Sequence, residues 1–175
     1  GIYMGALLGD SGTTDANGQF LFPDTTSLPA DFWVGTEPVF VRTRSYVTAT
    51  DNPVRMPTVY SATLDAALTA TGLTAVADDV VLVMVARDGT APAAAVTFAT
   101  VSGTVSSIYY LGTAGPNDWT ATAPTSSTGV AIAVVRGAVV ITGTAPDGRV
   151  ARFSNNAFVL GRRSVRLAEA TLTPP

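Results

Sequence analysis

The chain of 175 residues contains no cysteine, no histidine and no lysine. Without cysteine there is no disulfide and no thiolate nucleophile, and without histidine there is no imidazole base. Nearly every zinc or copper site is excluded by the same two absences. Because all ten cationic side chains are arginine, Schiff-base chemistry and phosphate binding by a P-loop lysine are also excluded. Carboxylates, hydroxyls and guanidinium groups remain, with oxygen ligands alone for a metal ion.

Charge is scarce as well. Charged residues make up 13% of the chain and the formal net charge is −3, so there is no basic surface to attract nucleic acid. The longest uniform apolar run, "VVLVMVA" at residues 80–86, is too short to span a bilayer. With 47% apolar residues the chain has enough material for a core. We therefore expect a globular protein with neither a nucleic-acid partner nor a membrane span.

Turn signals are frequent, and the runs between them are short and rich in Val, Thr, Ile, Phe and Tyr. The signals are DSG at 10–12, ANG at 16–18, DNP at 51–53, DGTAP at 88–92, GPND at 115–118, RG at 136–137 and PDG at 146–148. Short strands separated by such turns predict an all-β sandwich, in which RG starts one hairpin and PDG closes the next.

One segment breaks this pattern. In "PTVYSATLDAALTATG" at residues 57–72, Tyr60, Leu64 and Leu68 recur every four residues, and Ala and Leu replace Val. Pro57 near the start and Gly72 just past the end are typical helix boundaries, so we expect one helix at about residues 58–71.

The helix divides the chain into three parts. We expect a first β-sandwich part at residues 1–56, a connecting helix at 57–74 and a second β-sandwich at 75–175.

Three stretches carry a family resemblance. "TTDANGQFLF" (13–22), "DGTAPAAAVTF" (88–98) and "STGVAIAVVRGAVVITG" (127–143) resemble the turns and hairpins of carboxypeptidase-regulatory-like, or transthyretin-like, β-sandwich modules. In the second stretch, alanine stands at 93–95 where that family often has glycine. The resemblance implies an all-β fold of tandem sandwiches (transthyretin-like/Ig-like) with one short connecting helix. It also implies a secreted or surface appendage without catalysis.

The Asp15–Asn17 turn admits two readings. Alternating oxygen side chains suggest a calcium loop, but a loop of EF-hand type needs a bidentate Glu at its twelfth position, and none is near. Asp and Asn also tolerate turn geometry and bond their own backbone, while Gly18 supplies positive φ. We expect a structural turn and no metal site.

Catalytic residues are not predicted. Asp78 and Asp79 are adjacent and would point to opposite sides of a strand, so they are a poor acid and base pair for glycoside hydrolysis. The serines lack a histidine or lysine to activate them. We expect no enzyme activity and no cofactor, and a hydrolase using an Asp pair is the weakest alternative.

A sugar-binding surface is the stronger alternative. Tyr110, Asp118 and Trp119 lie in or beside a long loop, and an aromatic face with a neighbouring carboxylate can hold a polysaccharide. The opposing interpretation is that Trp119 plugs the end of the sandwich and that either Tyr109 or Tyr110 faces inward. Arg42, Arg44 and Tyr46, on one strand face, could meet an anionic polymer but are also typical of a solvated surface.

The first residues, "GIYMGALLG", are apolar on both faces of an extended strand. One explanation is strand addition between copies, in which Ile2, Met4 and Leu8 fill a neighbour's groove and build a filament. The other is that an upstream or neighbouring part of a larger surface protein covers them. Together these observations predict an extracellular or cell-surface structural or adhesive module that forms a homo-oligomer or lies beside neighbouring domains.

Overall fold

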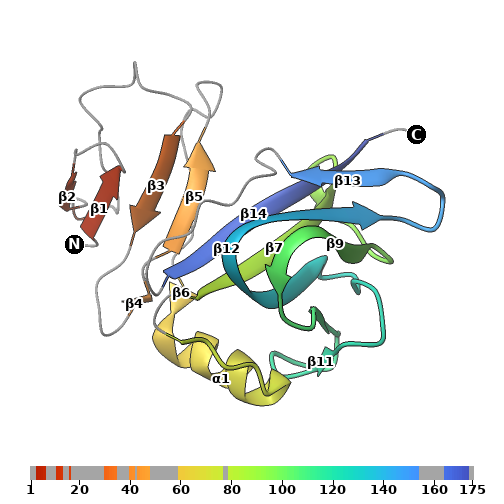
Figure 1. Cartoon of the computed structure of the whole chain (residues 1–175), viewed down its shortest axis with the longest axis horizontal. Helices are drawn as coiled ribbons and strands as arrows, with labels where there is room; N and C mark the ends of the chain where they lie inside the picture. Colours follow the sequence, from red (N-terminus) through yellow and green to blue (C-terminus); the bar gives the residue numbers. More distant parts are fainter. Residues whose placement is uncertain are drawn as a thin grey trace.

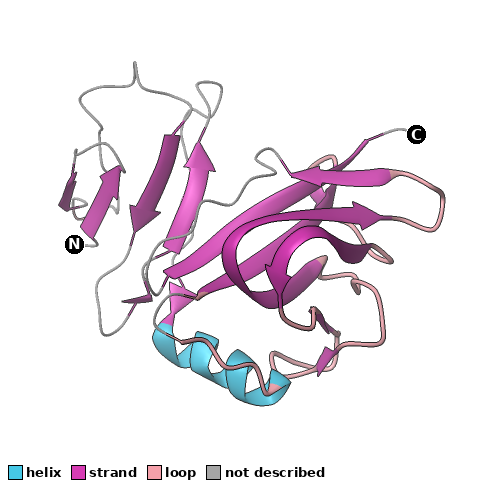
Figure 2. Ribbon diagram, in the orientation of Figure 1, coloured by secondary structure: helices cyan, strands magenta, loops and turns pink. Residues whose placement is uncertain are grey.

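The chain is described by a computed structural model in which residues 3–6, 11–13, 16, 30–34, 40–41, 43–47, 59–76, 79–153 and 164–173 are placed (Figure 1). Strands dominate these residues, and a single helix is present among them (Figure 2). The all-β class predicted from turn spacing is therefore confirmed.

The elements follow one another in a simple order. Before the helix lie β1 (Tyr3–Ala6), β2 (Ser11–Thr13), β3 (Ala30–Val34), β4 (Phe40–Val41), β5 (Thr43–Val47) and β6 (Val59–Tyr60). The helix is α1 (Ser61–Thr71). After it come β7 (Val80–Asp88), β8 (Ala91–Pro92), β9 (Thr97–Val105), β10 (Tyr109–Leu111), β11 (Trp119–Thr120), β12 (Val130–Thr144), β13 (Val150–Phe153) and β14 (Ser164–Thr173).

Most of the described strands belong to one mixed sheet. Twelve strands are connected by hydrogen bonds, and β4 and β6 form a separate antiparallel pair. Within the larger sheet β14 runs parallel to both β7 and β5, and the other pairings are antiparallel. Because β7 pairs with β12 and β14, and β13 also pairs with β12 and β14, these four strands close a circuit.

The larger core lies inside this circuit. Alternate residues of β7 and β14 point inward, as expected for strands, and meet residues of β9, β12 and β13. Leu82, Met84 and Val96 are completely buried, and the Phe98 ring stacks on that of Phe153 with centroids 5.7 Å apart. Burial of this apolar surface is the main source of stability for the second part of the chain.

Helix α1 covers the other face of the same strands. Its buried Ala67 joins Val81, Ile132, Val134 and Val165 in a second cluster. The expected helix is confirmed, and Gly72 ends it with φ +67 as the sequence predicted. It begins three residues later than expected, because Tyr60 precedes it in an extended conformation and is 55% exposed.

Strand β12 does not turn at the RG signal. It continues through Arg136 and Gly137, and the register with β9 shifts between Arg136 and Val140. Gly137 has φ +69, so the glycine permits a bulge instead of a reversal. The expected hairpin at 136–137 is therefore wrong, and the bulged strand bends so that one part pairs with β7 and the next with β9.

The predicted boundary between two sandwiches is crossed by the sheet. Strand β14 pairs in parallel with β5, which leads on to β3, β1 and β2, the strands to the side of the core in Figure 1. Thr43, Ser164 and Arg166 are buried at this junction. The described pairings confirm the all-β class but not the finer arrangement of tandem sandwiches, which stays a prediction.

Candidate functional site

Tyr110 lies in the core and does not reach the surface. Its side chain is 4% exposed, and its ring stacks on Phe98 with centroids 6.4 Å apart. The hydroxyl accepts a hydrogen bond from the Phe98 N–H (2.9 Å) and donates one to the Phe98 carbonyl (3.2 Å). Burial raises the pKa of this hydroxyl, and the bond to the Phe98 backbone acts in the opposite direction. The prediction that Tyr110 forms an exposed sugar platform is corrected accordingly.

This hydroxyl also protects an edge of the sheet. Among the described strands β9 pairs with β12 alone, so its other edge offers backbone groups to a further strand. The Tyr110 hydroxyl bonds the backbone N–H and carbonyl of Phe98. Just before β9, the Val96 N–H donates to the Thr125 hydroxyl and the Val96 carbonyl accepts from the Thr125 N–H. The beginning of β9 is therefore closed to strand addition.

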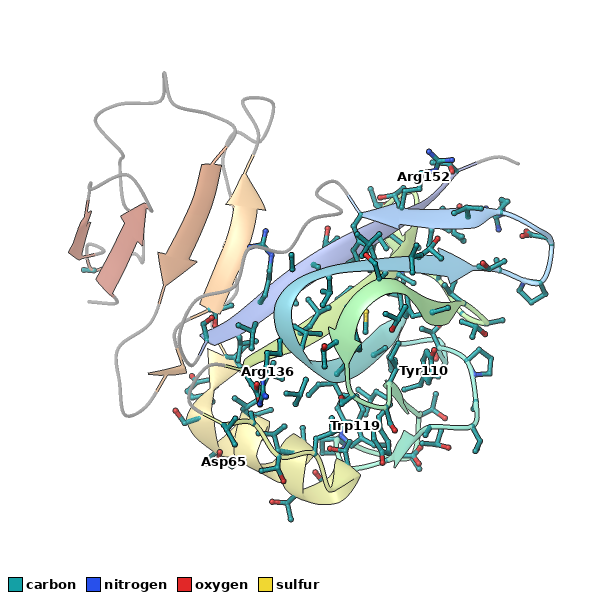
Figure 3. The ribbon with its side chains drawn as sticks, in the orientation of Figure 1. Asp65, Tyr110, Trp119, Arg136 and Arg152 are labelled. Atoms are coloured by element: carbon teal, nitrogen blue, oxygen red, sulfur yellow. The ribbon has the colours of Figure 1, made fainter. Side chains whose placement is uncertain are left out.

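Trp119 and Asp118 are used by their own loop. The Trp119 indole N–H donates to the Pro116 carbonyl (3.0 Å), and an Asp118 carboxylate oxygen accepts from the Ala114 N–H (3.0 Å). The Trp119 ring is half-buried and packs with the cluster beneath helix α1, and Figure 3 shows Trp119 near that helix. These contacts favour the interpretation that Trp119 closes one end of the fold.

The three predicted sugar-binding residues do not converge. Tyr110 belongs to the larger core, whereas its neighbour Tyr109 and Trp119 pack with the cluster on the helix side of the sheet. The sheet separates the Tyr110 ring from the other two aromatic rings, because adjacent residues of a strand point to opposite faces. The expectation that one of the two tyrosines faces inward holds for Tyr110, while Tyr109 is partly buried on the opposite side of the sheet.

The hydroxyl groups near this loop close turns. Ser126 Oγ donates to the Leu111 carbonyl (2.6 Å), and Ser106 Oγ donates to the Ser107 carbonyl and accepts from the Val134 N–H. Within the part of the chain that the structure describes, no three carboxylates gather as metal ligands. The hydrogen bonds of these serine hydroxyls in the described structure therefore stabilise the backbone.

Asp79 stabilises the start of β7. Its carboxylate accepts from Arg136 Nε (2.8 Å) and from the Val76 N–H (3.0 Å), and the residue is 6% exposed. The bond from Arg136, followed by that from Val76, holds the Asp79 pKa below its usual value. Its neighbour Asp78, the other half of the predicted pair, lies outside the described residues. Asp79 thus acts as a structural ion-pair partner of the β12 bulge.

The predicted assembly residues are only partly placed. Met4 lies in β1, which pairs with Gly12 of β2 on one edge and Val34 of β3 on the other. Ile2 and Leu8 lie outside the described residues, as do the Asp15 and Asn17 turn positions. Strand exchange through β1 would require this strand to leave two partners within its own chain.

The strand that carries Arg44 and Tyr46 is β5, and its backbone pairing is known. Arg44 and Tyr46 lie in β5, opposite Trp33 and Asp31 of β3, whereas Arg42 is outside the described residues. Arg44 is also the register partner of Arg166 in β14, so β5 is an interior strand.

A polar depression that the sequence did not predict lies where two hairpin ends meet. We call it the hairpin depression; it has a volume of about 310 Å³ and is lined by Asp88, Pro92, Ala93, Ala94, Ala145, Pro146, Asp147, Arg149 and Leu172. Arg149 Nη1 bonds Asp88 (2.8 Å) and Arg149 Nε bonds Asp147 (2.7 Å). The hydrogen bond to Asp88, followed by the bond to Asp147, raises the pKa of Arg149. The pKa of Asp147 is lowered by the bond from the Arg149 backbone N–H and then by the bond from the Arg149 guanidinium.

Both carboxylates belong to turn motifs of the sequence, DGTAP and PDG. Each motif predicts only a turn, because nothing local shows that Asp88 bonds an arginine 61 residues further along the chain.

Comparisons with protein-family models, with curated proteins and with solved structures found no match for this chain. Among the described residues, no helix has the length and apolarity needed to cross a membrane.

Proposed function

We propose that the protein is a non-enzymatic structural module of an extracellular or cell-surface assembly. The observation that carries this proposal is the use of the candidate side chains by the fold itself. Tyr110, Asp118, Trp119 and Ser126 each bond nearby backbone groups, and Asp79 bonds an arginine and a backbone N–H. Side chains that are hydrogen-bonded to the backbone in this way rigidify turns and strand ends, and a spacer domain that bears mechanical load requires such rigidity.

The extracellular location rests on the family resemblance and on composition. The three stretches that resemble transthyretin-like modules suggest a secreted or surface protein of bacteria. Labelling of intact producing cells with an antibody to this chain tests the location. Labelling that requires permeabilised cells would contradict it.

Trp119 separates the structural role from sugar binding. We expect Trp119→Ala to lower the free energy of unfolding by about 1–3 kcal/mol, because a half-buried ring is removed from beneath helix α1. A glycan array should show no binding at this loop in the parent protein. Glycan binding that is lost in Trp119→Ala while unfolding is unchanged would favour the carbohydrate-binding alternative, and turnover of a glycoside would favour the hydrolase.

Assembly by strand addition is a finer proposal that rests on Ile2 and Leu8. Placing aspartate at both positions should reduce the size of the particle in solution if these side chains fill a neighbouring copy. A native mass measurement of parent and variant decides this. A parent that is already a stable monomer, or a variant as large as the parent, would end the proposal.

A further inference from the structure

The hairpin depression combines an apolar floor with one polar wall. Its apolar lining consists of buried Ala93, Ala145 and Leu172 and of exposed Pro92 and Pro146. The wall is the ion-paired group of Asp88, Asp147 and Arg149. The depression belongs to neither predicted site. Its residues come from the ends of the β7–β8 and β12–β13 hairpins, from the segment just after β8, and from Leu172 of β14.

The polar wall is held in a fixed arrangement. Arg149 bonds one carboxylate through Nη1 and the other through Nε, while its own N–H donates to the second carboxylate oxygen of Asp147 (3.0 Å). Its side chain is 31% exposed, and those of Asp88 and Asp147 are each 52% exposed. Within the described structure, no hydrogen bond is found for Arg149 Nη2 or for Asp88 Oδ1, so this ion pair keeps donor and acceptor capacity for a ligand.

The charges of this wall select against ionic ligands. Two carboxylates and one guanidinium sum to about −1 at neutral pH, which disfavours a phosphate or a carboxylate ligand. A metal cation or an ammonium group would compete with the guanidinium that both carboxylates already bond. A neutral ligand with paired hydroxyls fits better, because each hydroxyl can accept from an arginine or donate to a carboxylate.

We propose that the hairpin depression is a weak binding site for a neutral saccharide. Adjacent hydroxyls of the sugar bond Arg149 Nη2 and the Asp88 carboxylate, and the C–H face of the ring lies on Pro92 and Leu172. The absence of an aromatic ring in the lining limits the apolar contact, so the expected dissociation constant is in the millimolar range. This inference goes beyond the structural role proposed above, and either can fail without the other.

Titration of the full chain with sugars, followed by amide chemical shifts, tests the site. Methyl α-glucoside, methyl α-mannoside and methyl β-galactoside are each added to about 100 mM, a level that populates a millimolar site. We expect saturable shifts at Ala93, Ala94, Asp147 and Arg149 with at least one of the three. Methoxytetrahydropyran, which has the ring without free hydroxyls, should give no saturable shifts.

Two variants of the wall and one control variant locate the interaction. Arg149→Met keeps an apolar stem and removes the donors, so the affinity should fall at least tenfold. Arg152→Met is the matched control, because Arg152 is exposed three residues further on and does not line the depression (Figure 3). Its affinity should equal that of the parent. Asp88→Asn preserves the shape of the wall and should weaken binding several-fold, which decides the question if Arg149→Met fails to fold.

Three results would overturn the proposal. They are the absence of saturable shifts with every sugar, equal affinity in parent and Asp88→Asn, and shifts that map to the Trp119 loop. The last result would support the carbohydrate-binding alternative instead. Shifts in the depression without any change in Trp119→Ala stability would leave this site standing and contradict the structural role of Trp119.

Discussion

The Tyr110 hydroxyl is a single buried polar group whose hydrogen bonds should contribute measurably to the stability of the fold. Tyr110→Phe keeps the ring stacked on Phe98 but leaves the Phe98 N–H without its acceptor in a buried place. We expect a loss of about 1–3 kcal/mol in the free energy of unfolding, the usual cost of an unsatisfied buried group. Urea unfolding measures it. Tyr109→Phe is the control, since no hydrogen bond of the Tyr109 hydroxyl is found among the described residues, and it should change stability much less.

Two small residues near β12 adopt positive φ for different reasons. Gly129 has φ +69, and a Cβ there would lie 2.6 Å from the Ala86 carbonyl oxygen. Gly137 has the same φ but nothing within 4 Å. Gly137→Ala should therefore cost about 1–2 kcal/mol from backbone strain alone, and Gly129→Ala should cost clearly more because a clash is added. If both variants lose the same free energy of unfolding in a urea titration, the backbone near Ala86 shifts to remove the clash with the new Cβ at no measurable cost.

Ala95 has a side chain at a backbone conformation that usually favours glycine. It is the one described non-glycine residue with positive φ, at +60, and it lies in the stretch where the resembling family often has glycine. Ala95→Gly should change stability by no more than about 1 kcal/mol, because relief of strain is offset by the greater freedom of the unfolded chain. A loss well above that value in urea unfolding would contradict this account.

At the scale of elements, helix α1 is held by a narrow line of contact with the sheet. Ala67 is 7% exposed and packs with Val81, Ile132 and Val134, whereas the adjacent Ala66 is exposed. Ala67→Asp should lower the free energy of unfolding by more than about 3 kcal/mol, because it buries an unpaired charge. Ala66→Asp, with the same chemical change, should stay within about 0.5 kcal/mol. Similar losses in both would mean that helix propensity, not packing, sets the cost.

For the whole molecule, the Asp79–Arg136 pair links stability to pH. Because the folded state holds the Asp79 pKa below its unfolded value of about 3.9, the ionised pair stabilises the fold above that pH. This contribution is lost as the pH falls through the lower, folded pKa. We expect Asp79→Asn to be less stable than the parent at pH 7 and to lose less stability between about pH 5 and pH 2.

Thermal unfolding across that pH range measures the effect. Asp65→Asn, at an exposed helix position, is the control and should follow the parent curve. If the stabilities of the parent and of Asp79→Asn differ by the same amount at every pH, the Asp79 side chain stabilises the fold through its shape and not through its charge.

The sequence by itself determined the features whose causes lie within a few residues. Helix α1 ends at Gly72 because glycine accepts the left-handed conformation. The PDG turn lies between β12 and β13 because Asp147 bonds the backbone N–H two residues on. Short runs of β-branched residues between such turns became strands, since these side chains favour extended backbone. Spacing alone was sufficient for the all-β class.

Only the tertiary structure decided what joins residues far apart in the chain. The signal at Arg136–Gly137 is compatible with a turn or a bulge, and pairing with β9 made it a bulge. Tyr110 faces the larger core because β10 pairs with β12 in one register, and a shift by one residue would have turned Tyr109 to that core instead. Arg149 meets Asp88 across 61 residues because two hairpin ends lie at the same end of the core. Strand pairing and register are non-local, and local propensities contain no information about them.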